Sequence, residues 1–281
     1  MNGIRKVKNY LFYFFTIFSA VFGLFFLFWI LLTIIVKGIL NFNFQVFLKD
    51  APPPGSDNLG GLRYAIIGHV IIVLLAILIG TPIGVLAGTY LAEYGKDSKL
   101  TNVIRTISDI LTSVPSIIIG LFVYAILVKP LGSFSAIAGA VALAILMIPI
   151  IVRVTDDMLT MVPKELREAA YALGAPKWVV ITKVTYRAAL AGILTGIALA
   201  IARIAGETAP LIFTSFNNNY LSLDITKPMA SLTMTIYQFA GSPFDNWKNL
   251  AWVGAFLLTV WVLILNLFGK YIAHKKAHKM R

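Results

Sequence analysis

The sequence predicts an all-α, polytopic membrane protein with six transmembrane helices. Of its 281 residues, 59% are hydrophobic and only 13% are charged, whereas soluble domains average about 45–50% and about 25%. Mean hydropathy is +0.85. Six apolar segments alternate with polar ones along the chain, and roughly 20 apolar residues suffice for a helix to cross a bilayer. The length suits one helical bundle with modest loops.

The apolar segments define the expected spans. The first is too long and too aromatic for a cleavable signal peptide, whose apolar region covers about 7–15 residues. After it, the PPPG sequence at 52–55 excludes a continuing helix. A short helix at 228–240, lying at the interface or within the bundle, is expected before the last span. The six spans are predicted at 10–36, 64–91, 103–128, 134–152, 188–213 and 250–272.

The basic residues predict the orientation of the spans. If the N-terminus is cytoplasmic, 17 of the 24 Lys and Arg residues lie in cytoplasmic segments and 6 in external segments, with Arg203 left in the membrane. Lys and Arg accumulate on the cytoplasmic side of membrane proteins. Both termini are therefore expected in the cytoplasm. The same bias accounts for the net charge of +12 without a nucleic-acid partner.

Two ionisable residues, Arg203 and Glu207, fall inside the fifth expected span. A charge at the bilayer centre costs roughly 2.5–3.5 kcal/mol even on insertion scales. On a continuous helix the two side chains would share a face with Gly192 and Gly196, and small residues let membrane helices approach closely. Two interpretations follow: a structural ion pair that joins helices, or an arginine that meets an anion during passage, held by the glutamate.

The segment 153–187 is the longest charged stretch between two apolar ones. Its sequence predicts a cytosolic helix at 164–173, with proline before it, acidic residues in its first turn and Gly174 after its end. A second short helical stretch is expected after Pro176. About 35 residues is long for a loop in a compact bundle, which favours a docking surface for a cytosolic partner protein over a solvated connector.

Other polar signals are weaker. Ser108, Thr112 and Ser116 share a face of the third expected span, where they could line a pathway or bond to backbone carbonyls. The chain has no cysteine and no G-x-x-x-x-G-K-[ST] loop, so it is not expected to hydrolyse ATP itself. We expect no catalytic site, no metal site and no bound cofactor.

Five segments of the chain carry a further pattern: TPIGVLAGTYLAEY (81–94), SDILTSVPSIIIGLF (108–122), REAAYALGAPKW (167–178), AGILTGIALAIARIAGETAPLIFT (191–214) and PMASLTMTIYQFA (228–240). The third segment, with Glu168, Ala169, Ala170 and then Gly174, is similar to the EAA loop of ABC importer permeases, although the Leu-Pro that closes its consensus is replaced by Val184–Arg187. The EAA pattern is specific for importer permeases but not for a substrate. Together the five segments resemble the PstA-type permeases of phosphate ABC importers, and the pairing of ARIAGETAPL with SVPSIIIGLF is what points to phosphate.

The resemblance implies a type I ABC importer permease fold, with a five-helix core and an added first helix. It implies four partners besides phosphate and the lipid bilayer: a PstC-type second permease, two cytosolic ATPase subunits that use ATP, and an extracytoplasmic phosphate-binding protein. Glu168, Ala169, Ala170 and Gly174 would couple to the ATPases, and Arg203 and Glu207 would act in phosphate passage. The location implied is a prokaryotic plasma membrane.

The expected organisation has two parts. Residues 1–62 hold the first span and an extracytoplasmic loop, and residues 63–281 form the permease core with the coupling segment 153–187. The leading hypothesis for function is a permease subunit that forms half of a phosphate pathway. The alternatives are a permease for another oxyanion or small solute, a proton-coupled secondary anion carrier, or a structural membrane subunit. An inverted repeat, common in secondary carriers, is not evident.

Overall fold

The computed structural model describes residues 2–56, 60–95 and 98–279, all of them helical or irregular, with no β-strand in those ranges. Lys96 and Arg281, which the charge count above includes, lie outside the described residues. The principal helices are α1 (Asn2–Leu40), α2 (Arg63–Thr89), α3 (Lys99–Ser113), α4 (Ser116–Val123), α5 (Lys129–Leu131), α6 (Ala136–Thr160), α7 (Lys164–Ala172), α8 (Lys177–Val179), α9 (Tyr186–Ala205), α10 (Ala209–Ile212), α11 (Leu232–Ala240) and α12 (Asp245–Lys279).

Five helical segments in the described chain are long and apolar enough to cross a membrane, and a sixth passes this test as a bent pair. The prediction of an all-α protein with six spans is therefore confirmed. The third span differs from expectation, because α3 and the helix from Ser116 to Leu131 meet at an angle of 107°. Pro115 explains the break: it lacks a backbone N–H, and it disfavours a helical conformation at Val114, which is extended with ψ 131°.

The fifth span also differs from expectation at its start. Helix α8, a π-helical turn (Val180–Thr185) and α9 follow without interruption, so the segment runs from Lys177 to Ala205 rather than from 188 to 213. The stretch after Pro176 is therefore the first part of this span and not a separate helix. At the other side of the charged segment, α6 continues to Thr160, and only residues 161–176 connect the two long helices.

Glycines set the packing of α2, α6 and α9. A Cβ on Gly84 would lie 2.7 Å from the Cβ of Ile151, and one on Gly88 would lie 2.6 Å from the Cβ of Thr155. Gly192 and Gly196 of α9 approach Met158 and Val154 in the same way. Helix α6 therefore occupies the centre of the bundle, with α2 and α9 packed closely against it.

Helix α11 packs inside the bundle. Its residues Leu232, Thr233, Met234, Thr235 and Phe239 are buried, and the Phe239 ring stacks on Trp247 of α12 with centroids 4.5 Å apart. The segment before it, from Pro228 to Ser231, is not helical. The helix expected at 228–240 is thus shorter than predicted, and one of its faces belongs to the core rather than to the surface.

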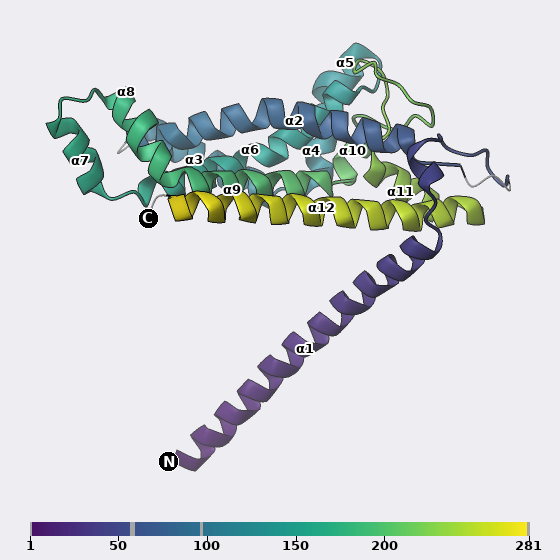
Figure 1. Ribbon diagram of the computed structural model, residues 1–281, viewed down its shortest axis with the longest axis horizontal. Helices are drawn as coiled ribbons and strands as arrows, with labels where there is room; N and C mark the ends of the chain where they lie inside the picture. Colours follow the sequence, from purple (N-terminus) through teal and green to yellow (C-terminus); the bar gives the residue numbers. More distant parts are fainter. Residues whose placement is uncertain (1, 57–59, 96–97, 280–281) are drawn as a thin grey trace.

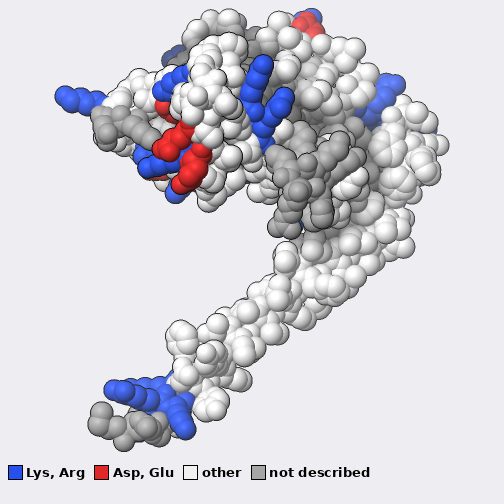
Figure 2. All heavy atoms as spheres, turned by 60° about the vertical axis from the view of Figure 1, so that its left-hand side comes forward, with Lys and Arg blue, Asp and Glu red and all other residues white. Residues whose placement is uncertain are grey.

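Helix α1 leaves the bundle, as Figure 1 shows, and none of its most apolar 18-residue window is buried. It is attached near its C-terminal end, where the Lys37 ammonium lies 4.6 Å from the Trp252 ring centre and Gly38 lies close to Phe256. In Figure 2 its length is white, with Lys and Arg at its far tip. At one end of the bundle lie α7 and α8, and at the other end lie α5 and the loop before α11 (Figure 1).

Candidate functional site

Helix α9 ends between the two ionisable residues of the fifth span. Its last residue is Ala205, and the helix is closed by two backbone hydrogen bonds: the Gly206 N–H donates to the Arg203 carbonyl oxygen at 3.1 Å, and the Glu207 N–H donates to the Ile204 carbonyl oxygen at 3.2 Å. Glu207 lies beyond the helix, where its own carbonyl oxygen accepts a hydrogen bond from the Thr233 hydroxyl at 3.0 Å. The i,i+4 pair expected from a continuous helix therefore does not form. No ion pair among the described residues contains Arg203 or Glu207.

Arg203 lies near the middle of the bundle in depth. Gly192 faces Met158 and Gly196 faces Val154. Helices α9 and α6 are therefore antiparallel, and a higher residue number on α9 lies level with a lower residue number on α6. Seven residues beyond Gly196, Arg203 comes level with the centre of α6, about 10 Å farther along the axis at roughly 1.5 Å per residue.

The Arg203 side chain is exposed in the isolated chain, whereas Ala200 on the preceding turn is fully buried. A guanidinium at this depth is not stable against lipid tails without a partner. Arg203 therefore faces water or another protein in the membrane. An exposed, unpaired arginine can bind an oxyanion through its planar fork of N–H donors.

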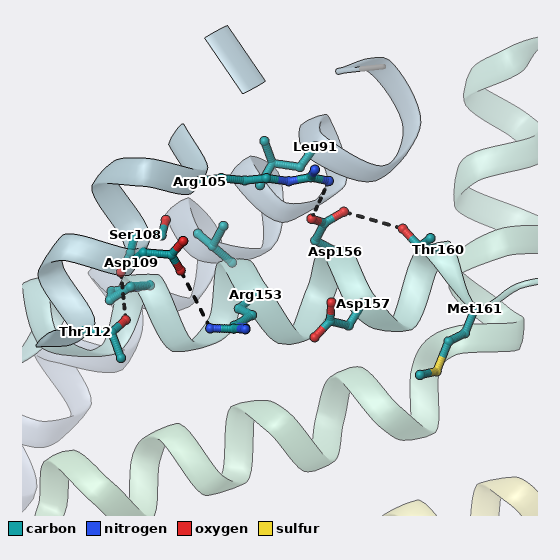
Figure 3. A pocket seen from close by; sticks show the side chains of 12 residues that line it. Leu91, Arg105, Ser108, Asp109, Thr112, Arg153, Asp156, Asp157, Thr160 and Met161 are labelled. Carbon is teal, nitrogen blue, oxygen red and sulfur yellow. Dashed lines mark hydrogen bonds and ion pairs between the residues drawn. The ribbon is translucent and has the colours of Figure 1, made fainter. Parts of the chain in front are cut away.

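A cavity of about 440 Å³ that contains several charged side chains lies between α3 and α6, and its lining extends to Thr160 and Met161 at the end of α6 that leads to α7. Two ion pairs cross it, as Figure 3 shows: Arg105 to Asp156 at 3.0 Å and Arg153 to Asp109 at 3.6 Å. Asp157 also lines it and has no ion-pair partner among the described residues. The five charged groups give the cavity a surplus of one negative charge.

The structure separates the three hydroxyl residues expected on one helical face. Ser108 and Thr112 both line the cavity, and the Thr112 hydroxyl donates to the Ser108 carbonyl oxygen at 2.7 Å. Ser116 lies beyond the 107° break, at the start of α4, and is not among the cavity residues. Arg105 and Asp109 lie beside this face in the sequence as well, but their ion pairs were not predicted, because the partners lie on a different helix.

Helix α7 begins after Pro163, carries Glu165 in its first turn and buries none of its residues fully. Gly174 follows with φ +79°, a conformation that favours glycine. Glu168 and Ala169 are exposed and Ala170 is half-buried. Large apolar side chains are also exposed here: Leu166, Tyr171 and Leu173 on or beside α7, and Trp178 on α8. This combination is typical of a surface that another protein covers.

Arg167 is a structural residue that the sequence analysis missed. Its guanidinium donates to the Glu93 carboxylate at 2.9 Å and to the carbonyl oxygens of Leu159 at 2.6 Å and Val162 at 2.7 Å. Both partners of the ion pair are largely buried, with side chains 17% and 7% exposed. Glu93 lies 74 residues earlier in the chain, and no local pattern connects the two positions.

No group of three or more His, Cys, Asp or Glu side chains that could hold a metal ion occurs within the described ranges. The site consists instead of a mid-depth arginine, a charged cavity and an exposed helix at one end of the bundle.

Residues 80–278 match the family model described as the inner membrane component of binding-protein-dependent transport systems. The chain belongs to this family. It is a transport component and not itself an enzyme. A relative from Pasteurella multocida, named phosphate transport system permease protein PstA, is 54% identical over 97% of both chains.

Other relatives of this transport component are similar over nearly their whole length. A protein of the same name from Haemophilus influenzae is 54% identical, covering 97% of this chain and 96% of the relative. Phosphate transport system permease protein PstA 1 from Mycobacterium tuberculosis is 34% identical, covering 99% and 91%.

Solved structures share the fold. The MetNI methionine ABC transporter, in an inward-facing conformation, contains a chain with a TM-score of 0.60 at 22% identity, covering 77% of this chain and 94% of that one. A bacterial alginate ABC transporter contains one with a TM-score of 0.65 at 14% identity, covering 98% of both. The type I ABC importer permease fold is therefore confirmed, and the chain is a multi-pass inner membrane protein.

Proposed function

We propose that this chain is the transmembrane permease subunit of an ATP-driven importer of inorganic phosphate, in which it forms half of the translocation pathway. The observation that carries the proposal is the 54% identity to a phosphate transport permease over 97% of both chains. Because the identity extends over nearly the whole of both chains, it supports a shared role for the two proteins and not only a shared fold. Phosphate is thus the substrate, in preference to other oxyanions.

In this function Arg203 binds the phosphate as it passes the middle of the membrane. The exposed, unpaired guanidinium supports this role, since an oxyanion would supply the missing negative partner. Glu207, half-exposed just beyond the end of α9, keeps the local charge near neutral when phosphate is absent. Ser108 and Thr112 line the exit toward the cytoplasm, whereas Ser116, at the start of α4, lies nearer the bend.

The proposed complex contains a PstC-type second permease, two cytosolic ATPase subunits and an extracytoplasmic phosphate-binding protein. ATP binds to the ATPase subunits, and this chain holds no cofactor. Glu168, Ala169, Ala170 and Gly174 form the surface that seats in an ATPase, which the exposed apolar side chains around them support. Both termini lie in the cytoplasm, on the side of α7. Lipid and the second permease would cover α1 and the face that exposes Arg203.

Reconstitution of the complete complex in proteoliposomes tests this function. We expect ATP inside the vesicles and loaded binding protein outside to drive uptake of radiolabelled phosphate, with no competition from sulfate or molybdate at equal concentration. Uptake of sulfate or molybdate in place of phosphate would assign the chain to another oxyanion. Phosphate uptake by this chain alone, without ATP, would instead assign it to the secondary carriers.

A further inference from the structure

The C-terminal end of α2 lies where the exposed helices α7 and α8 meet the packed bundle. Glu93 lies in the π-helical turn Tyr90–Tyr94 that ends α2. Because α7 buries no residue fully, its apolar contacts alone hold it weakly. The largely buried guanidinium of Arg167, in the middle of α7, makes three polar contacts with the bundle.

Arg167 joins three helices at one point. Its hydrogen bonds to Leu159 and Val162 satisfy carbonyl oxygens at the C-terminal end of α6, at 2.6 and 2.7 Å, where a cation is favoured by the helix dipole. Its bond to Glu93 at 2.9 Å reaches the end of α2. Helices α2 and α6 are themselves in glycine-mediated contact along their length, so a displacement of α7 acts on both together.

A second connection lies on the other side of the Gly174 turn. The Lys177 ammonium lies 4.0 Å from the centre of the Tyr94 ring, and the Tyr186 hydroxyl is hydrogen-bonded to the Thr89 hydroxyl. The π turn Tyr90–Tyr94 is therefore contacted from both sides of Gly174, by Arg167 before it and by Lys177 after it.

We propose that the ion pair between Arg167 and Glu93 is the mechanical link that transmits the movement of α7 to the α2–α6 pair during transport. Both are positioning residues, because neither contacts the proposed substrate path at Arg203. Helix α6 carries Arg153 and Asp156 of the cavity, so movement of α6 changes the cavity between α3 and α6. The inference rests on the proposed function for its substrate, but the link itself concerns ATP coupling.

The test uses the complete reconstituted complex and measures phosphate uptake and ATP hydrolysis in the same vesicles. In Glu93→Gln and Arg167→Gln complexes we expect ATPase subunits to bind at near wild-type yield, while phosphate transported per ATP falls at least tenfold. We also expect loaded binding protein to stimulate ATP hydrolysis less in these variants than in the wild-type complex. The matched control is Asp50→Asn, which breaks the Arg63–Asp50 pair of 3.0 Å at the opposite end of the bundle and leaves transport per ATP unchanged.

A covalent replacement of the ion pair separates transmission from folding. The chain has no cysteine, so Glu93→Cys combined with Arg167→Cys creates the only cysteine pair in this chain for a short bifunctional thiol reagent. Wild-type complex plus reagent is the control, because it reports any effect of the reagent on the other subunits. We expect the double variant to be uncoupled before cross-linking and to regain most of its transport per ATP afterwards. The cross-linking experiment compares the same double variant before and after the reagent, so it tests the link even if the glutamine variants assemble poorly.

Two results would overturn the link: wild-type transport per ATP in assembled Glu93→Gln complexes, or no recovery after cross-linking. A wild-type complex that fails to transport phosphate would instead contradict the proposed substrate. In that case the comparison of wild-type and Glu93→Gln complexes is repeated with the oxyanion that the wild-type complex transports, and transport of that ion per ATP reports on the link.

Discussion

At the scale of single residues, the most informative feature is a charge without a partner. Arg203 is exposed at mid-depth, although arginine in contact with lipid there is disfavoured by several kcal/mol. Arg105 and Arg153, in contrast, are each paired with an aspartate. Of these three arginines, only Arg203 lacks an ion-pair partner among the described residues, and it is therefore free to bind an anion.

Substitution of Arg203 tests this assignment. We expect Arg203→Gln to leave the assembly of the complex intact and to lower phosphate uptake by about 10- to 100-fold or more, because a charge-assisted hydrogen bond contributes roughly 1.5–3 kcal/mol. The loss is measured as uptake of radiolabelled phosphate by cells that carry equal amounts of the wild-type or variant protein in the membrane. Leu199→Gln, one turn earlier on the same exposed stripe, serves as the control. Normal uptake by the Arg203 variant would remove Arg203 from the pathway.

Glu168 is the exposed acidic residue at the centre of the proposed ATPase surface. Glu168→Lys should reduce the yield of co-purified ATPase subunits several-fold, since a reversed charge at an interface costs free energy through like-charge contacts. The control is Lys248→Glu, which also changes charge by two but lies at the opposite end of the chain's bundle. Equal ATPase yield from both variants would argue against docking at α7.

At the scale of helices, the contact between α2 and α6 depends on glycine. A Cβ at Gly88 would lie 2.6 Å from both the Val152 carbonyl oxygen and the Thr155 Cβ, and a backbone oxygen cannot move away cheaply. Gly88→Ala is expected to destabilise the bundle by about 1–3 kcal/mol. Thermal unfolding in detergent measures the loss.

Gly23 provides the matched control for that substitution. It lies within helix α1, where an added Cβ meets nothing within 4 Å, so Gly23→Ala should keep or slightly raise thermal stability through its higher helix propensity. Equal melting temperatures for the two variants would show that α2 and α6 are less closely packed than described.

At the scale of the whole molecule, the absence of cysteine makes the orientation directly measurable. We expect a membrane-impermeant thiol reagent to label Lys129→Cys in intact cells and to leave Leu173→Cys unlabelled until the cells are permeabilised. Leu173 is 88% exposed, so protection of that position cannot come from burial in this chain. The opposite labelling pattern would place α7 outside the cell and exclude its role as an ATPase contact.

Hydropathy predicted most of the fold because each span is an apolar run of its own. The errors were local: the break at Pro115, and the end of α9 at Ala205, which a helix pattern alone did not locate. The ion pairs could not be predicted, since Arg167 and Glu93 lie 74 residues apart and each sits in an ordinary polar segment. Arg203 was identified because a charge inside an apolar run is visible without any knowledge of its neighbours.

The broken third span has a consequence for how the chain enters the membrane. Helix α3 carries Arg105 and Asp109, whose partners Asp156 and Arg153 belong to α6. Because Asp156 lies 51 residues after Arg105, α3 leaves the ribosome before its partners on α6 exist, and until then Arg105 and Asp109, four residues apart, have only each other to pair with. We therefore expect α3 to settle in its final position in the membrane only after α6 has been made.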